Sequence, residues 1–294
     1  MTAWQPSGVV SVLPTTFHDK GTLDLEGVAA LVQAHRSAGV SGLTVLGVMG
    51  EAAELTEDER ALVVDQVLEA AGDLPVVVGI SAPSAAGIAE RAVAAARAGA
   101  AAVLVSPGVA VPLGTAVRAA ADGGLAIVVQ DYPAGSGITL SAADIDLAVR
   151  GEPLIVGVKA EAPPTASAIA ELGRLLPGLA VVGGLGGLFL PDELRAGAAG
   201  TMTGFALPER LVAIVEAFPI DPERAEAAWV ELLPLMRLEA FPPFSLAARK
   251  EVWRLRGVIR SSRCRRPGAV LDATAAEDVR RAFYRVGGAA VSPT

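Results

Sequence analysis

The chain has 294 residues, of which 52% are hydrophobic and 19% are charged, and its formal net charge is −8. This length and composition are sufficient for a large buried core, and the negative charge gives no electrostatic basis for binding nucleic acid or an anionic membrane. The single cysteine, Cys264, excludes an intramolecular disulfide framework and a metal site made of several cysteines.

Short runs rich in valine, isoleucine and leucine alternate with alanine-rich amphipathic segments through the first 219 residues. The apolar runs predict strands at 9–13, 43–46, 76–80, 102–105, 126–130, 155–159, 180–183 and 200–203. The segments between them predict helices such as 25–38, 57–71 and 84–98. Continuous apolar strands that are each followed by a helix are typical of a parallel sheet buried on both faces. The repeated unit favours a (β/α)₈ TIM barrel over a doubly wound sheet, which would usually carry a GxGxxG motif after its first strand.

Beyond residue 219 the pattern is helical only. Helices are predicted at 222–238, 244–256 and 274–286, with a break at the FPPF sequence of 241–244 and a capping box in the TAAE sequence of 274–277. Each helix has one apolar face that needs a packing partner. We therefore predict a barrel over 1–219 and a C-terminal helical extension over 220–294 that packs on the barrel.

A TIM barrel carries its chemistry at the carboxyl ends of its strands. The residues that follow the predicted strands are therefore the candidate site residues. They are Thr16 after the first strand, Gly47, Val48, Met49, Gly50 and Glu51 after the second, Gln130 and Tyr132 at the fifth, Lys159 and Glu161 at the sixth, Gly183 and Gly184 at the seventh, and Thr203 at the eighth.

Lys159 is one of only three lysines in the chain, and it ends an apolar strand. Burial of an ammonium group is costly, which favours the neutral amine, and a neutral lysine amine attacks carbonyl carbon to form a Schiff base. The alternative is a structural ion pair of Lys159 with Glu161 or Asp131. The residues alone leave both interpretations open.

The motifs LPTTF, GVMGE followed by LTEDER, QDYP, GVKAE and a glycine-rich seventh strand occur in one collinear order over nearly the whole chain. This order resembles the dihydrodipicolinate synthase / N-acetylneuraminate lyase family of class I, Schiff-base aldolases. The resemblance implies a barrel followed by C-terminal helices and a homodimer or homotetramer. It also implies that Lys159 forms a Schiff base with a 2-oxo acid of the pyruvate type.

The chain departs from the family pattern at three motifs. The family's second-strand motif usually reads GTTGE, and Val48 and Met49 replace the two threonines that help to hold the keto-acid carboxylate, so only backbone N–H groups remain there. The fifth-strand motif usually reads YNxP, and its proton-relaying tyrosine is replaced by Gln130, whose amide cannot act as an acid or base. The arginine that binds a substrate carboxylate in the synthases aligns with Gly135. We therefore do not expect dihydrodipicolinate synthase activity.

Two residues are candidates to replace the missing phenol as acid or base. Tyr132 shares a face with Gln130 if the strand continues, because side chains alternate along a strand. Glu161 lies two residues beyond Lys159, and a carboxyl group at an apolar barrel mouth can transfer protons. The alternatives are that Tyr132 only packs in a loop and that Glu161 only forms a salt bridge.

These observations predict a Schiff-base lyase or aldolase that acts on a 2-oxo acid through Lys159. The alternative is a family paralogue that has lost catalysis and serves as a ligand-binding or regulatory protein. His18 and His35 are isolated in the sequence and are expected to be solvated, and no metal-ligand spacing occurs, so we predict neither a metal nor a cofactor. No signal-peptide pattern or membrane span is evident, so we expect a cytoplasmic protein without nucleic-acid or membrane partners.

Overall fold

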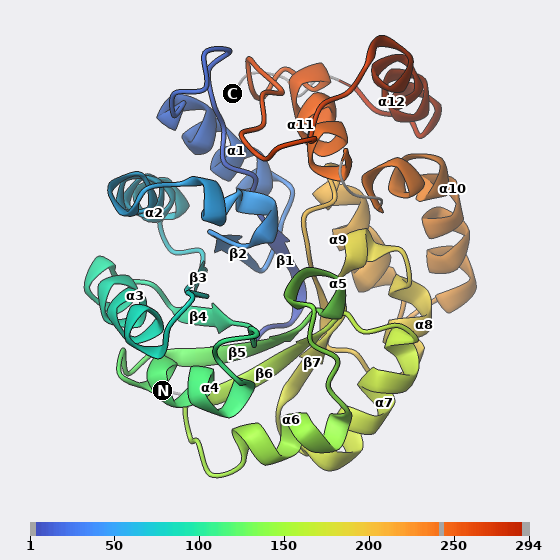
Figure 1. Ribbon diagram of the computed structural model, residues 1–294. Helices are drawn as coiled ribbons and strands as arrows, with labels where there is room; N and C mark the ends of the chain where they lie inside the picture. The colour runs from blue at the N-terminus through green and yellow to red at the C-terminus, as the bar shows by residue number, and fades with distance from the viewer. Residues whose placement is uncertain (1–3, 241–243, 290–294) are drawn as a thin grey trace.

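The computed structural model describes residues 4–240 and 244–289, and its centre is a barrel of parallel strands (Figure 1). The strands are β1 (Gly8–Val12), β2 (Gly42–Val45), β3 (Val76–Gly79), β4 (Ala102–Val105), β5 (Ala126–Asp131), β6 (Ile155–Ala160), β7 (Ala180–Val182) and β8 (Gly200–Thr203). Their order is β7-β6-β5-β4-β3-β2-β1-β8. A parallel bridge between Gly183 and Thr201 joins the two ends of this order. The predicted TIM barrel is confirmed.

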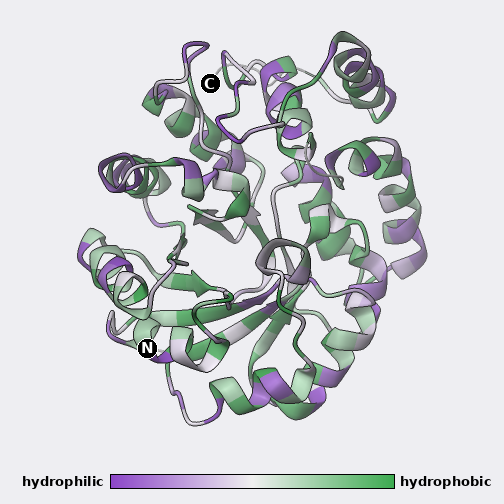
Figure 2. Cartoon of the chain, in the orientation of Figure 1, coloured by the Kyte–Doolittle hydropathy of each residue, from purple (hydrophilic) through white to green (hydrophobic). Residues whose placement is uncertain are grey.

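Helices surround the strands and alternate with them along the chain. They are α1 (Leu25–Ser37), α2 (Glu57–Ala71), α3 (Ala85–Ala98), α4 (Leu113–Ala121), α5 (Pro133–Ser136), α6 (Ala142–Val149), α7 (Thr165–Leu175), α8 (Leu190–Arg195) and α9 (Pro208–Ala217). Short 3₁₀ turns are η1 (Val48–Gly50), η2 (Ala52–Glu54) and η3 (Leu185–Gly187). Figure 2 shows that the strands are mainly hydrophobic and that hydrophilic residues lie on the outer helices. Both faces of the strands are thus buried, as their continuous apolar sequences predict.

The C-terminal extension consists of α10 (Pro222–Ala240), α11 (Ser245–Leu255) and α12 (Ala273–Arg285), and α10 packs on α9 and α8 of the barrel. The extension that the sequence predicts is present, and the division at residue 219 remains our proposal. The predicted break at 241–244 falls largely on 241–243, which lie outside the described residues.

The predicted capping box at 274–277 is wrong. Helix α12 begins one residue earlier, and Asp272 is its N-cap, because its side chain accepts a hydrogen bond from Ala275 N at 2.8 Å. An aspartate caps as well as a threonine and adds a negative charge at the positive end of the helix. At α2, by contrast, Thr56 and Glu59 form both hydrogen bonds of a capping box.

The expectation that His35 is solvated is also wrong, whereas His18 is exposed as expected. The extension covers the end of α1, so that His35 is buried with its ring 4.8 Å from that of Trp253 on α11. Burial lowers the pKa of His35 to about 4, which keeps its imidazole neutral at pH 7. Within residues 4–240 and 244–289, no group of three or more His, Cys, Asp or Glu could hold a metal ion, and no helix is long and apolar enough to span a membrane.

The register between β5 and β6 shifts by one residue, and this shift decides which side chains enter the barrel. Ile127 pairs with Ile155, whereas Val128 pairs with Gly157. As a result Val156 packs in the barrel interior and Val158 packs outward against the helices. If side chains alternated regularly along β6 from Val156, Lys159 would point outward. The extra residue of β6 at the register shift instead turns Lys159 toward the barrel interior.

A buried ion pair ties the extension to the loop after β2. Neither Glu51 nor Lys250 of α11 has an exposed side chain, and Lys250 Nζ lies 2.5 Å from Glu51 Oε1. The other carboxylate oxygen accepts hydrogen bonds from the backbone N–H groups of Arg265 and Arg266, both at 2.7 Å. Lys250 also donates to the carbonyl of Arg263 at 2.8 Å. Both charges are therefore compensated, which makes removal of either partner costly.

We expect Lys250→Met to lower the free energy of unfolding by about 3–5 kcal/mol, because the substitution leaves the Glu51 carboxylate buried without its counter-ion. Chemical denaturation measures the loss. The matched control is Lys20→Met, which changes an exposed lysine and should stay within about 0.5 kcal/mol of the parent. A loss below about 1 kcal/mol for Lys250→Met would show that the pair does not anchor the extension.

A second buried carboxyl group, that of Glu193 on α8, lies behind β7. A Cβ atom added to Gly183 would lie 1.8 Å from Glu193 Oε2, and neither carboxyl oxygen has a hydrogen-bond partner in the described chain. Burial raises the pKa of Glu193 to about 7, and the negative charges of Glu161 and Asp192 raise this pKa further. The folded protein therefore holds this proton more tightly than the unfolded chain does.

The raised pKa predicts that Glu193 contributes stability below about pH 4.3, and that this contribution is lost as the pH rises to about 7. We expect Glu193→Gln to remove that dependence. The difference in unfolding free energy between parent and variant should then change by about 2–3 kcal/mol between pH 5 and pH 8. Chemical denaturation of both proteins at the two pH values measures this change. An equal difference at both would mean that Glu193 titrates normally in the folded protein.

Candidate active site

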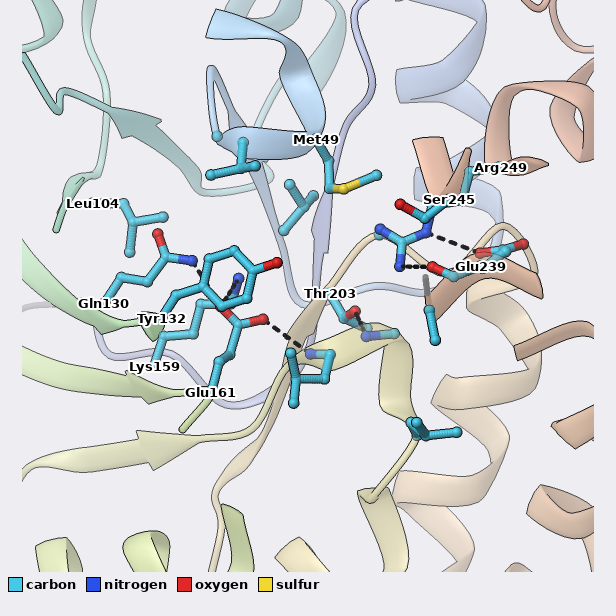
Figure 3. A pocket seen from close by; sticks show the side chains of 18 residues that line it. Met49, Leu104, Gln130, Tyr132, Lys159, Glu161, Thr203, Glu239, Ser245 and Arg249 are labelled. Carbon is cyan, nitrogen blue, oxygen red and sulfur yellow. Dashed lines mark hydrogen bonds and ion pairs between the residues drawn. The ribbon is translucent and has the colours of Figure 1, made fainter. Parts of the chain in front are cut away.

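A cavity of about 170 Å³ lies at the carboxyl ends of the strands (Figure 3). Residues from β1, β4, β5, β6 and β8 line it, together with η1, η3 and helices α10 and α11 of the extension. Cavities for drug-sized ligands typically measure about 300–1,000 Å³, so this one suits a small molecule of few carbon atoms.

Lys159 and Glu161 lie side by side on the cavity wall. Lys159 Nζ is 2.9 Å from Glu161 Oε2, and both side chains are buried. Of the two ion-pair partners that the sequence leaves open for Lys159, the structure pairs it with Glu161. Asp131 lies apart, and its Oδ1 has no hydrogen-bond partner among the described residues. The amine of Lys159 thus enters the cavity next to a group that can accept its proton.

Gln130 completes a hydrogen-bonded chain with Glu161. Gln130 Nε2 donates to Glu161 Oε2 at 2.7 Å, and Gln130 Oε1 accepts from the Ser106 hydroxyl at 3.0 Å. Ser106 therefore fixes the orientation of the amide, so that its N–H faces the carboxylate. The sequence analysis did not predict Ser106 as a site residue. Ser106 nevertheless directly follows β4, and the carboxyl ends of barrel strands are where site residues are expected.

Tyr132 also lines the cavity, and Figure 3 shows its hydroxyl directed into the open space. Its ring lies against Gly135, where an added Cβ atom would stand 2.4 Å from the ring carbons. Burial and the charge of Glu161 raise the pKa of the phenol, so it stays protonated at pH 7. The described residues form no hydrogen bond with its hydroxyl, which leaves the hydroxyl available to a ligand.

The loop after β2 forms the upper wall of the cavity. Gly47, Val48 and Met49 line the cavity, and the backbone N–H groups of Val48 and Met49 have no acceptor among the described residues. Such a pair of unpaired N–H groups at the start of a helical turn suits a carboxylate. Gly50 and Glu51 do not reach the cavity, because Glu51 turns away to Lys250.

The ends of β7 and β8 form the floor. Thr203 lines the cavity, and its hydroxyl accepts a hydrogen bond from Gly186 N at 2.8 Å. Gly183 and Gly184 were expected here but lie outside the lining, where their missing side chains leave room for Glu193 and Glu161. Their neighbours Leu185 and Gly186 take the place at the cavity.

Thr16 is not part of the cavity lining. Its hydroxyl donates to the carbonyl of Asp24 at 2.5 Å, and the Asp24 side chain in turn caps α1. Its place after β1 is that of a site residue, but its hydroxyl is used within the β1–α1 loop. Thr16 thus supports the loop rather than a ligand.

The extension supplies a charged pair that the sequence analysis did not identify. Arg249 of α11 and Glu239 of α10 line the cavity, and Arg249 Nε lies 3.1 Å from Glu239 Oε2. Burial raises the pKa of Glu239 to about 7, although Arg249 and the N–H of Ala206 favour its charged form. Neither residue directly follows a barrel strand. The expectation that site residues lie at the carboxyl ends of strands therefore could not identify them.

Comparison with known proteins shows the family to which the chain belongs. The model of the dihydrodipicolinate synthetase family matches residues 5–285. An L-2-keto-3-deoxyarabonate dehydratase of Azospirillum brasilense is 35% identical over 88% of each chain. A 4-hydroxy-tetrahydrodipicolinate synthase of Haloarcula marismortui is 33% identical over 87% of this chain and 86% of its own.

Among solved structures, a dihydrodipicolinate synthase from Rhodopseudomonas palustris superposes with a TM-score of 0.91. It is 32% identical in sequence, and the match covers 96% of this chain and 99% of the other. The fold and the sequence relationship agree. The chain belongs to the dihydrodipicolinate synthetase family and is a lyase-type enzyme.

Proposed function

We propose that the enzyme forms a Schiff base between Lys159 and a small 2-oxo acid, and that it dehydrates a 3-deoxy-2-oxo sugar acid. The observation that carries this proposal is the position of Glu161. Its Oε2 lies 2.9 Å from Lys159 Nζ and 2.7 Å from Gln130 Nε2, so a carboxylate stands where it can replace the missing tyrosine as acid and base.

In the first step Glu161 takes a proton from the Lys159 ammonium, and the neutral amine attacks the C2 carbonyl of the substrate. The carbinolamine then loses its hydroxyl as water, with a proton returned by Glu161, and an iminium forms. The N–H groups of Val48 and Met49 hold the substrate carboxylate, because they are unpaired and lie on the same cavity.

The iminium makes the C3 protons acidic, and Glu161 removes one to give the enamine. The enamine electrons then expel the C4 hydroxyl, which leaves as water with a proton from Glu161. Hydrolysis of the conjugated iminium releases an unsaturated 2-oxo acid and restores the lysine. The net change in the substrate is the loss of one water molecule, and Glu161 ends each cycle in its initial state.

Two observations favour dehydration over condensation to dihydrodipicolinate precursors. The Tyr132 ring occupies the space beside Gly135, so the carboxylate-binding arginine of the synthases has no counterpart there. The relative from Azospirillum brasilense bears the name of a dehydratase that acts on a five-carbon 3-deoxy-2-oxo acid. The small cavity also agrees with a substrate of that size.

The assembly and the location in the cell remain proposals. We propose a homodimer or homotetramer in the cytoplasm, as the family resemblance implies.

Borohydride reduction in the presence of pyruvate tests the first step. We expect intact-mass measurement to show one reduced pyruvate adduct per chain, and we expect Lys159→Met to abolish it because no other buried lysine lines the cavity. Lys20→Met is the matched control and should trap pyruvate as the parent does. A parent protein that traps no 2-oxo acid would favour the ligand-binding alternative.

Glu161→Gln tests the acid–base step. We expect it to lower turnover of 4,5-dihydroxy-2-oxopentanoate by about 10²–10⁴-fold, because an amide of the same shape cannot transfer the proton. Substrate loss followed by NMR measures the rate. Tyr132→Phe removes the other candidate hydroxyl and should retain most of the activity. If Tyr132→Phe is the variant that loses activity, the phenol carries the step; if neither loses it, neither residue does.

A further inference from the structure

The cavity has two charged ends on opposite sides. Lys159 and Glu161 form one end, and Arg249 and Glu239 form the other (Figure 3). The mechanism above uses only the first end. The second end is as deeply buried, since Arg249 and Glu239 are 6% and 1% exposed. A buried charged pair that faces a ligand cavity without a part in the chemistry requires its own explanation.

Arg249 is held rigidly by two hydrogen bonds. Its Nε donates to Glu239 Oε2 at 3.1 Å, and its Nη2 donates to the carbonyl of Glu239 at 2.9 Å. Its remaining nitrogen, Nη1, has no acceptor among the described residues. One guanidinium edge is therefore fixed while the other keeps its donors for a ligand.

The floor of the cavity gives the guanidinium room. A Cβ atom added to Gly186 would lie 3.2 Å from Arg249 Nη2, and one added to Gly204 would lie 3.3 Å from Nη1. Both glycines thus allow Arg249 to lie close to the floor, beside Thr203. Ser245, at the start of α11, adds a hydroxyl group to the same end of the cavity.

The Arg249–Glu239 pair at this end disfavours a ligand with a second carboxylate. Glu239 already balances Arg249, so a second substrate carboxylate would have to compete with Glu239 for the guanidinium or lie beside a like charge. Hydroxyl groups meet neither difficulty, because they accept hydrogen bonds from the Arg249 guanidinium without bringing a second negative charge to this end of the cavity.

We propose that Arg249, oriented by Glu239, binds the hydroxylated tail of the substrate and thereby determines which 2-oxo acids the enzyme accepts. The substrate class is a monocarboxylic 3-deoxy-2-oxo acid of about five or six carbons with an uncharged hydroxylated tail. This inference rests on the proposed function, because the tail is located relative to a carbonyl carbon bound to Lys159.

The test compares two 2-oxo acids of equal length, 4,5-dihydroxy-2-oxopentanoate and 2-oxopentanoate. The concentration of each that gives half-maximal borohydride trapping is measured by intact mass for the parent and for Arg249→Met. We expect the parent to prefer the dihydroxy acid by about 10- to 100-fold, the range of hydrogen bonds to a charged group. Arg249→Met should reduce that preference to about threefold or less.

Two further variants separate recognition from folding. Arg249→Met leaves Glu239 buried without its partner, so the double variant Arg249→Met/Glu239→Gln removes both charges and keeps the test valid if the single variant is unstable. It should lose the preference as well. Arg256→Met is the matched control: Arg256 is a buried arginine of the same region that pairs with Glu209 outside the cavity, and its loss should leave the preference unchanged.

Each outcome has one meaning. A parent that traps both acids but does not distinguish them, or an Arg249 variant that keeps the full preference, overturns the inference and leaves the proposed function intact. An equal loss of trapping for both acids also overturns it, since Arg249 would then act only on the structure. A parent that traps neither acid overturns the proposed function and this inference with it.

Discussion

The Glu161 carboxylate is the constraint on which the site depends. One oxygen meets Lys159 of β6 and Gln130 of β5, and the other accepts the backbone N–H of Leu185 in η3 at 2.9 Å. A side chain at position 184 would exclude the Glu161 carboxyl group from this place, because a Cβ atom on Gly184 would lie 2.2 Å from Glu161 Oε1. One buried carboxylate thus joins β5, β6 and η3. Structural pairing and catalysis are therefore compatible roles for Glu161.

Helix α11 connects stability with recognition. Lys250 anchors it to the loop after β2 through Glu51, and Arg249, the preceding residue, faces the cavity. The two neighbours point to different partners because successive residues of a helix are about 100° apart. The residue that anchors the extension and the arginine that we assign to the substrate tail are therefore neighbours on one helix.

The sequence predicts the fold well because parallel strands buried on both faces must be apolar along their whole length. Such continuous apolar runs can be recognised in the sequence without knowledge of tertiary contacts. It also predicts Lys159, Glu161, Gln130 and Tyr132, because barrel chemistry follows strand ends. The direction of Lys159 depends on a one-residue register shift between β5 and β6, which no periodicity reveals. Arg249 and Glu239 were missed because a charged residue on a helix normally indicates a solvated face. Thr16 was assigned to the site from its position, but its hydroxyl is used by its own loop.

The central claim is that Glu161 moves protons at a Schiff base on Lys159, and exchange of the pyruvate methyl protons in D₂O tests it without knowledge of the substrate. The exchange requires both the iminium and a base that removes the C3 proton. The account predicts that the parent replaces these protons with deuterium, as followed by proton NMR. Glu161→Gln should form the borohydride-trapped pyruvate adduct only on longer incubation, and it should exchange the methyl protons about 10²–10⁴-fold more slowly than the parent. Exchange by Glu161→Gln at the parent rate would contradict the account.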